Sequence, residues 1–280
     1  DAQKKEYLPK IASGELRLQA FGVTEPTTGS DTTQLKTRAD KDGDDYIING
    51  QKVWTSRALH SDLMLLLART ESADTVKKRS DGLSTFLVDM REAKGKGMDI
   101  KPLDAMVNHN TTEIFFDNLR IPGSALIGEE GKGFRYILDG MNAERILIAG
   151  ECVGDARFFT RRAVEYANER VVFGRPIGQN QGVQFPIAKA YADAEAAAMM
   201  ARKAAAMFDA GLPCGAEANM AKHLCSEAAW QAAEACFTTF GGFAFAREYD
   251  IERKWREVRI MRTAPISTNM ILGFIGQYVL

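Results

Sequence analysis

The hydrophobic periodicity of this chain changes once, near residue 128, and this change limits the folds that the chain can adopt. Up to about residue 127, turn residues separate short or alternating apolar runs such as DDYIINGQKVWTS and TTEIFFDNLRIP. Runs of this kind are typical of β-strands. After GEEGKG at 128–133 the apolar spacing becomes helical, with Ala-rich stretches over 185–210 and 217–240. The sequence therefore predicts an α+β protein, in which an antiparallel, β-barrel-like domain precedes a helical bundle.

One turn is predicted inside the first of these strand patterns. Asn49-Gly50 lies in the middle of DDYIINGQKVWTS, and both residue types tolerate a positive φ. Two further segments, at 71–81 and 91–97, are rich in charged residues or in Lys and Gly, which is typical of solvated loops. We therefore expect a β-hairpin at residues 49–50 and exposed loops at the other two places.

The composition argues against several classes of partner. The 280 residues include 36 Lys and Arg against 37 Asp and Glu, so a net charge of -1 provides no broad basic surface for nucleic acid. No apolar run reaches the ~20 residues that cross a bilayer, so no membrane span is expected. The four cysteines lack CxxC spacing, and the three histidines do not cluster with them. We expect free thiols in a reducing, intracellular compartment and no metal site.

A glutamate in an apolar helical pattern is the first candidate for chemistry. Glu144 lies in GMNAERILIAGE, with Met141 one turn before it and Leu147 and Ile148 one turn after it. Partial burial there would raise the pKa of its carboxyl, which suits a group that takes a proton near neutral pH. Two structural explanations compete with this one: Arg145 neutralises the carboxylate, or both residues lie at an exposed helix start.

Three polar segments are candidates for binding. FGVTEPTTGSD at 21–31 offers backbone N–H groups and hydroxyls to a polar ring or a phosphate. VWTS at 53–56 combines an indole with two hydroxyls, which can stack on and hydrogen-bond a flat cofactor. ERVVFGRPIGQNQ at 169–181 sets arginines beside glycines, as in many pyrophosphate sites. Each also has an ordinary explanation: a hydroxyl-rich turn, a buried tryptophan at a strand end, and solvated charge.

In this order, the segments resemble those of the acyl-CoA dehydrogenase family. The resemblance continues through FDNLRIP and FGGFAFAREYDIERKWREVRI, so it covers essentially the whole chain. It implies a remnant of an N-terminal helical domain at 1–14, a β domain at 15–127 and a C-terminal four-helix bundle at 128–280, with the rest of the first domain absent. It also implies FAD as the cofactor and a homodimer or homotetramer.

The family's pattern assigns roles to residues of this sequence. One group would line or adjoin the flavin ring: Phe21, Val23, Thr24, Trp54, Thr55 and Ser56. A second group would reach the FAD of a partner subunit: Arg170, Phe173, Gln181, Gly241 and Gly242. Ser30, counted with the cofactor residues, would also face the acyl-CoA. These assignments follow from the resemblance.

The catalytic base is where this sequence departs from most relatives. Those enzymes take the base from a Tyr-Glu-Gly-Thr loop, but the corresponding stretch here is RTAPISTN, which places Pro265 at the position of the glutamate. A minority of the family uses a Glu-Arg pair early in the first bundle helix, and Glu144-Arg145 is similar to that pair. Proline also has no N–H with which to hold the thioester oxygen, so we expect Ile266 N–H to replace it, with Arg145 on the substrate side.

The resemblance implies an FAD-dependent dehydrogenation of an acyl-CoA to the 2-enoyl-CoA, with an electron-transfer flavoprotein as acceptor. The location would be a bacterial cytoplasm, or the mitochondrial matrix if the protein is eukaryotic. Two alternatives remain at this point. One is an acyl-CoA oxidase or related flavin oxidase or monooxygenase on the same fold, and the other is an inactive, FAD-free fragment that serves only as an oligomeric domain.

Overall fold

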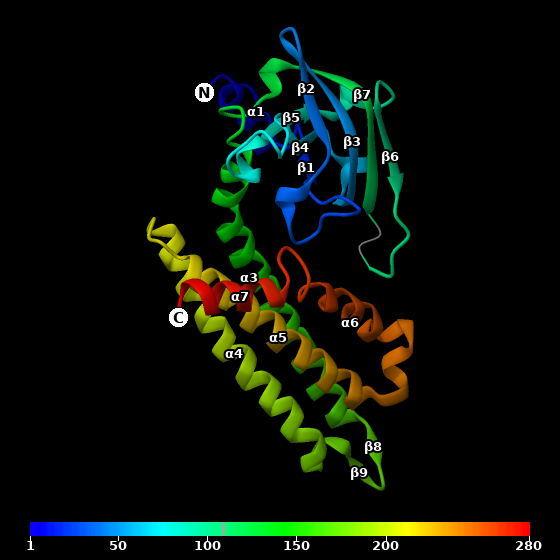
Figure 1. Cartoon of the computed structure of the whole chain (residues 1–280). Helices are drawn as coiled ribbons and strands as arrows, with labels where there is room; N and C mark the ends of the chain where they lie inside the picture. Colours follow the sequence, from blue (N-terminus) through cyan, green and yellow to red (C-terminus); the bar gives the residue numbers. More distant parts are fainter. Residues whose placement is uncertain (108–109) are drawn as a thin grey trace. The chain divides into compact units, whose positions relative to one another are not determined.

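The computed structural model describes residues 1–107 and 110–280 (Figure 1). Its contacts divide the chain into two compact units, Asp1–Asp139 and Gly140–Leu280. The boundary falls inside helix α3 (Gly133–Glu169), whose first residues belong to the first unit. The chain therefore passes from one unit to the other along a helix.

The first unit is built on a curled, mixed β-sheet with the strand order β1-β4-β2-β3-β7-β6, and β5 pairs with β4 (Figure 1). Most neighbours are antiparallel, but β1 and β2 each run parallel to β4. The predicted β domain is thus confirmed, as a mixed sheet. The elements are α1 (Ala2–Ala12), β1 (Leu18–Gly22), β2 (Arg38–Asp42), β3 (Asp45–Ser56), β4 (Leu63–Arg69), β5 (Leu83–Asp89), α2 (Met90–Ala93), β6 (Met98–Pro102) and β7 (Thr111–Pro122).

The predicted hairpin at Asn49-Gly50 is wrong, because β3 runs through both residues. The chain turns instead between β2 and β3, where Gly43 has a φ of +63°. Gly50 has a φ of +147°, and a Cβ there would lie 2.6 Å from Oγ1 of Thr37. The glycine therefore permits a close approach of two chain segments, which a sequence pattern cannot distinguish from a turn.

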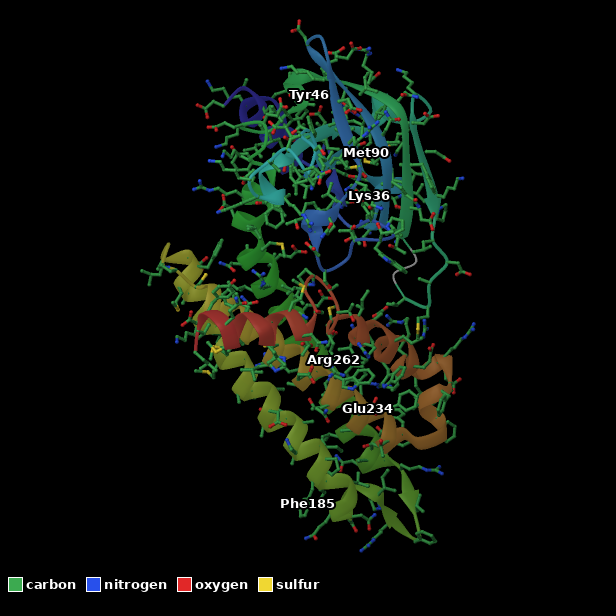
Figure 2. The ribbon with its side chains drawn as sticks, viewed as in Figure 1. Lys36, Tyr46, Met90, Phe185, Glu234 and Arg262 are labelled. Carbon is green, nitrogen blue, oxygen red and sulfur yellow. The ribbon has the colours of Figure 1, made fainter. Side chains whose placement is uncertain are left out.

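The core of the first unit lies on β4, whose apolar run LMLLLAR is almost entirely buried. A strand buried on both faces is apolar at successive positions, because neither face meets water. Tyr46 (labelled in Figure 2) packs edge-on against Phe86 on β5, with ring centroids 4.9 Å apart. Burial and a hydrogen bond to Glu130 raise the pKa of Tyr46 to about 12, which keeps this phenol neutral.

The second unit is helical, as the change of periodicity predicts. Alanines form most of its core, and they let the long helices α4 and α5 pack closely. An aromatic cluster closes one end, where Tyr166 stacks on Phe240 at 4.1 Å. The elements are the main part of α3, the hairpin β8 (Val171–Val172) and β9 (Arg175–Pro176), α4 (Gln181–Asp209), α5 (Gly215–Phe240), α6 (Ile251–Ile260) and α7 (Thr268–Tyr278).

All four cysteines lie in this helical unit, and all are free and buried. Burial raises the pKa of Cys225 and of Cys236 to about 12, and it raises the pKa of Cys152 further. Within residues 1–107 and 110–280, no cluster of His, Cys, Asp and Glu could hold a metal ion, and no helix is both long and apolar enough to cross a membrane. His109, one of the three histidines for which the sequence predicts no metal site, lies outside the described residues.

Candidate functional site

The first candidate segment follows β1 and lies against β3. Val53 N–H donates to the carbonyl of Thr24 at 2.9 Å, and the Lys52 ammonium donates to the carbonyl of Val23 at 3.0 Å. The two segments that the sequence singled out, 21–31 and 53–56, are therefore brought together. In the described part of the chain, no hydrogen bond uses the backbone N–H of Val23 or Thr24, so both donors are free for a ligand.

The end of β3 is shaped by a bulge. Its pairing with β7 shifts register between Lys52 and Thr55, and Trp54 has a φ of +61°, a left-handed conformation that is uncommon for a bulky residue. The indole of Trp54 is 60% exposed, whereas Thr55 is buried and Ser56 is half-buried. The alternation of the strand thus presents Trp54 to the surface and turns the side chain of Thr55 inward.

Other residues assigned to this site differ in exposure. Phe21 is 38% exposed, Val23 and Thr24 are half-buried, and Ser30 is exposed. The buried hydroxyls of Thr28 and Thr55 have no hydrogen-bond partner within the described residues. Exposed aromatic faces beside two free N–H donors fit a flat ring with an apolar face and a polar edge, such as a flavin.

A second group of predicted residues meets in the helical unit. Arg170, Gly241 and Gly242 line one pocket of about 470 Å³, together with Phe243, whose ring lies 5.8 Å from the guanidinium of Arg170. Phe173, at the turn between β8 and β9, is fully exposed and has a φ of +52°. Gln181 is exposed at the start of α4 and does not line the pocket. A glycine pair, an arginine and exposed apolar groups suit part of a dinucleotide.

Glu144 lies about three turns into α3 and is half-buried. Burial raises the pKa of its carboxyl above the ordinary value of 4.5, and the positive charge of Arg145 only partly opposes this. Among the described side chains, no ion pair joins the two residues, since Arg145 donates to Asn142 at 3.0 Å and leaves its Nε without a partner. The structure thus shows no direct ion pair between Glu144 and Arg145 among the described residues, and it places Glu144 inside α3 and not at its start.

Lys222 on α5 is a buried cation that sequence reasoning missed. It is fully buried, and its ammonium donates to the carbonyl of Ile266 at 2.8 Å. Burial, with the nearby charges of Arg145 and Arg262, lowers the pKa of Lys222 to about 8, although Cys152 and Glu227 oppose the shift. Arg262 (labelled in Figure 2) lies just after α6. A lysine among the buried alanines of a helix was the sequence signal for it.

The same contacts bring Arg145 and Ile266 into one part of the helical unit. Ile266 lies in the turn between α6 and α7, where no hydrogen bond of the described chain uses its N–H. Pro265 precedes it and has no N–H to offer. The Ile266 N–H is therefore an available donor next to a position that lacks one.

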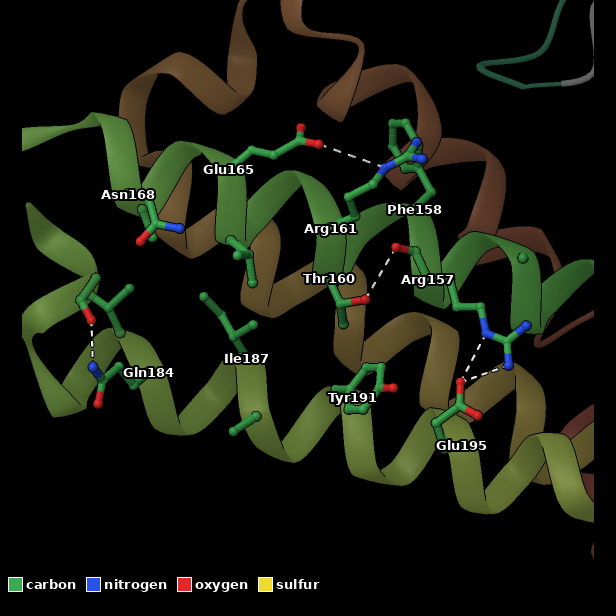
Figure 3. Close-up of a pocket in the computed structure, with 16 residues that line it drawn as sticks. Arg157, Phe158, Thr160, Arg161, Glu165, Asn168, Gln184, Ile187, Tyr191 and Glu195 are labelled. Atoms are coloured by element: carbon green, nitrogen blue, oxygen red, sulfur yellow. Dashed lines mark hydrogen bonds and ion pairs between the residues drawn. The ribbon is translucent and has the colours of Figure 1, made fainter.

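One groove of the helical unit contains none of the predicted residues. It has a volume of about 960 Å³, lies between α3 and α4, and is bounded in part by Phe158, Ile187 and Tyr191 (Figure 3). Arg157 and Glu195 form an ion pair of 2.7 Å at its lining. Cavity size alone would thus point to a part of α3 that contains none of the predicted residues.

Comparisons with known families account for both units. The model for "Acyl-CoA dehydrogenase, middle domain" matches residues 20–119, and the model for "Acyl-CoA dehydrogenase, C-terminal domain" matches residues 131–279. The chain belongs to the acyl-CoA dehydrogenase family. Members of this family are FAD-dependent oxidoreductases that act on CH–CH bonds, so the predicted family, enzyme class and cofactor are confirmed.

Individual relatives agree with this family. Acyl-CoA dehydrogenase FadE12 of Mycobacterium tuberculosis is 37% identical over 279 residues, which are 99% of this chain and 71% of FadE12. The crystal structure of the acyl-CoA dehydrogenase from Geobacillus kaustophilus matches with a TM-score of 0.95 at 30% identity, covering 100% of this chain and 73% of that one. The prolyl acyl carrier protein oxidase AnaB matches with a TM-score of 0.91 at 27% identity, covering 100% and 72%. The fold is thus shared by flavin dehydrogenases and oxidases.

Proposed function

We propose that the chain converts an acyl-CoA thioester to the 2-enoyl-CoA, and that Glu144 is the base that removes the proton from the α-carbon. FAD supplies the acceptor for the hydride that leaves the β-carbon. The half-buried carboxylate of Glu144 carries the proposal, because it has a raised pKa and no partner among the described residues. A carboxylate with these properties can take a proton near neutral pH.

The turn between α6 and α7 would hold the thioester oxygen. Negative charge develops on this oxygen as the α-proton leaves, and a hydrogen-bond donor aimed at it lowers the barrier. The unused N–H of Ile266 supports this role, and the bond from Lys222 to the carbonyl of the same residue would hold this turn against α5. Arg145 would add positive charge on the substrate side.

The surface residues support an assembly in which subunits share FAD. Phe173 has no cover from its own chain, and Arg170 lies in a pocket with the Gly241-Gly242 pair. In the proposed homodimer or homotetramer these residues would contact the FAD of a partner subunit. Electrons would then pass to an electron-transfer flavoprotein.

The test is a single-turnover reduction under anaerobic conditions, in which holoenzyme is mixed with a panel of acyl-CoAs and flavin bleaching is followed. Glu144→Gln should retain FAD and acyl-CoA binding but lose bleaching by about 10²-fold or more. Glu151→Gln is the matched control, since Glu151 lies two turns further along α3 and its pKa is also raised by burial. Equal bleaching by Glu144→Gln and the parent would overturn the base assignment.

The second candidate function is that of an oxidase. The chain is 27% identical to a prolyl acyl carrier protein oxidase, which supports this candidate. Both reactions begin with the same proton removal, so they differ only after the flavin is reduced. Admitting air to the reduced enzyme separates them. Reoxidation within a catalytic turnover supports the oxidase, and slow reoxidation supports the dehydrogenase.

A further inference from the structure

The β unit buries one complete ion pair beneath the candidate flavin segment. Lys52 is fully buried on β3, and its ammonium lies 2.9 Å from Oε1 of Glu25, which is 5% exposed. The two carboxylate oxygens of Glu25 also accept the backbone N–H groups of Lys36 at 2.6 Å and Thr37 at 2.9 Å. The pair therefore ties three segments of chain together at one point.

This arrangement is costly to build. Removing two charges from water costs several kcal/mol for each ion, and an apolar pair of the same volume often stabilises a fold equally well. Stability alone therefore does not explain why the chain buries Lys52 and Glu25. A second explanation is that the two residues orient the neighbouring segment 23–24.

The ammonium makes one contact that the ion pair itself does not need. It donates to the carbonyl of Val23, while the main chain of β3 donates to the carbonyl of Thr24. A planar peptide joins the Val23 carbonyl to the Thr24 N–H, so fixing this carbonyl toward β3 also fixes the direction of the free Thr24 N–H. We propose that Lys52 and Glu25 are positioning residues for the flavin, because their pair holds residues 23–24 in the orientation that the ring requires.

The proposal rests on the flavin assignment of residues 21–24 and does not depend on Glu144 as the base. It therefore stands or falls separately from the proposed reaction. Its readouts are FAD affinity and the absorption spectrum of bound flavin, neither of which requires turnover.

A second buried cation in the same sheet provides a matched control. Arg69 on β4 is 8% exposed and donates to the carbonyls of Thr33 and Leu35, at 2.7 and 3.2 Å, without contacting residues 21–24. Arg69→Met should loosen the β unit as Lys52→Met does. It should leave the FAD dissociation constant within about twofold of the parent, because Arg69 donates no hydrogen bond to residues 23–24 and acts on Glu25 only through its charge.

The experiment compares Lys52→Met, the double variant Lys52→Met/Glu25→Gln, and Arg69→Met, all purified with FAD. FAD dissociation is measured by flavin fluorescence, and folding is checked by circular dichroism. Lys52→Met should weaken FAD binding by about 10- to 100-fold, the size of loss seen when supporting hydrogen bonds are removed around bound metal ions. The spectrum of the remaining bound flavin should also shift.

The double variant separates positioning from stability. It removes the unpaired buried charge, so its thermal stability should recover relative to Lys52→Met, but it still lacks a donor to the Val23 carbonyl, so FAD binding should stay weak. Three results would overturn the proposal: parental FAD affinity in folded Lys52→Met, recovery of affinity together with stability in the double variant, or an equal loss in Arg69→Met.

Discussion

Among the described residues, each unit buries one lysine completely, and the two lysines are held in different ways. Lys52 in the β unit lies against a carboxylate, whereas Lys222 in the helical unit donates to a backbone carbonyl. Burial lowers the pKa of both to about 8. Lys52 is buried next to an opposite charge, whereas Lys222 is stabilised by the dipole of a peptide group. Although both lysines are equally buried, removing each one should therefore change the stability by a different amount.

Removing the paired lysine should cause the largest change. Lys52→Met leaves Glu25 charged and buried without its counter-ion, which should lower the stability of the β unit by about 3–5 kcal/mol. Hydrogen exchange resolved by peptide, over β3 and β4, measures this loss apart from the helical unit. A change below about 1 kcal/mol would contradict the account of the pair.

Removing the other lysine should cost less. Lys222→Met deprives the Ile266 carbonyl of its donor, at about 1–3 kcal/mol, but it also removes a charge that is expensive to bury. Hydrogen exchange resolved by peptide, over α5 and over the turn before α7, measures this loss of stability. If this loss equals or exceeds that of Lys52→Met, the comparison of the two lysines fails.

The pH dependence of the helical unit should be smaller still. The pKa of Lys222 is 10.5 when unfolded and about 8 when folded, so between these values the unfolded state binds more protons. The contribution of Lys222 to stability then rises with pH across that window, by at most about 1.4 kcal/mol per pH unit, while the buried thiols oppose it above about pH 9, so the difference between the parent and Lys222→Met isolates it. Denaturant unfolding followed by thiol exposure, at pH 7 to 9.5, tests this slope. Lys222→Met should lack the contribution.

The smallest effect is expected at Phe173. Its side chain is fully exposed on its own chain and touches neither core, so Phe173→Ser should change the stability of the FAD-free protein by less than about 0.5 kcal/mol. A thermal scan of the parent and the variant suffices. A larger loss would mean that this residue is covered in the assembled protein.

The sequence predicted the parts of this fold that depend on local pattern. Periodicity located the strands and long helices, because alternation and helical spacing follow directly from which face is buried. It could not show that Gly50 serves a close approach to Thr37, since that contact depends on a neighbouring strand. The parallel pairing of β1 with β4 is also set by long-range topology.

The sequence also predicted part of the candidate site, namely the segments with recognisable motifs, but not the buried charges that depend on long-range packing. Motif resemblance supplied the segments at 21–31 and 53–56, which the structure brings together. Lys222 escaped notice because one charged residue in an Ala-rich helix resembles a solvated position until the helix is packed. The partner of Lys52 was equally hidden, because Glu25 lies 27 residues away.

The placement of the cysteines gives the helical unit its own chemical reporter. Every thiol lies there and is buried, and burial raises the pKa of Cys152, Cys225 and Cys236, so a labelling reagent can react only when the helices open. The rate of alkylation therefore reports the opening of the helical unit alone, because the β unit contains no cysteine. The measurement needs no engineered label.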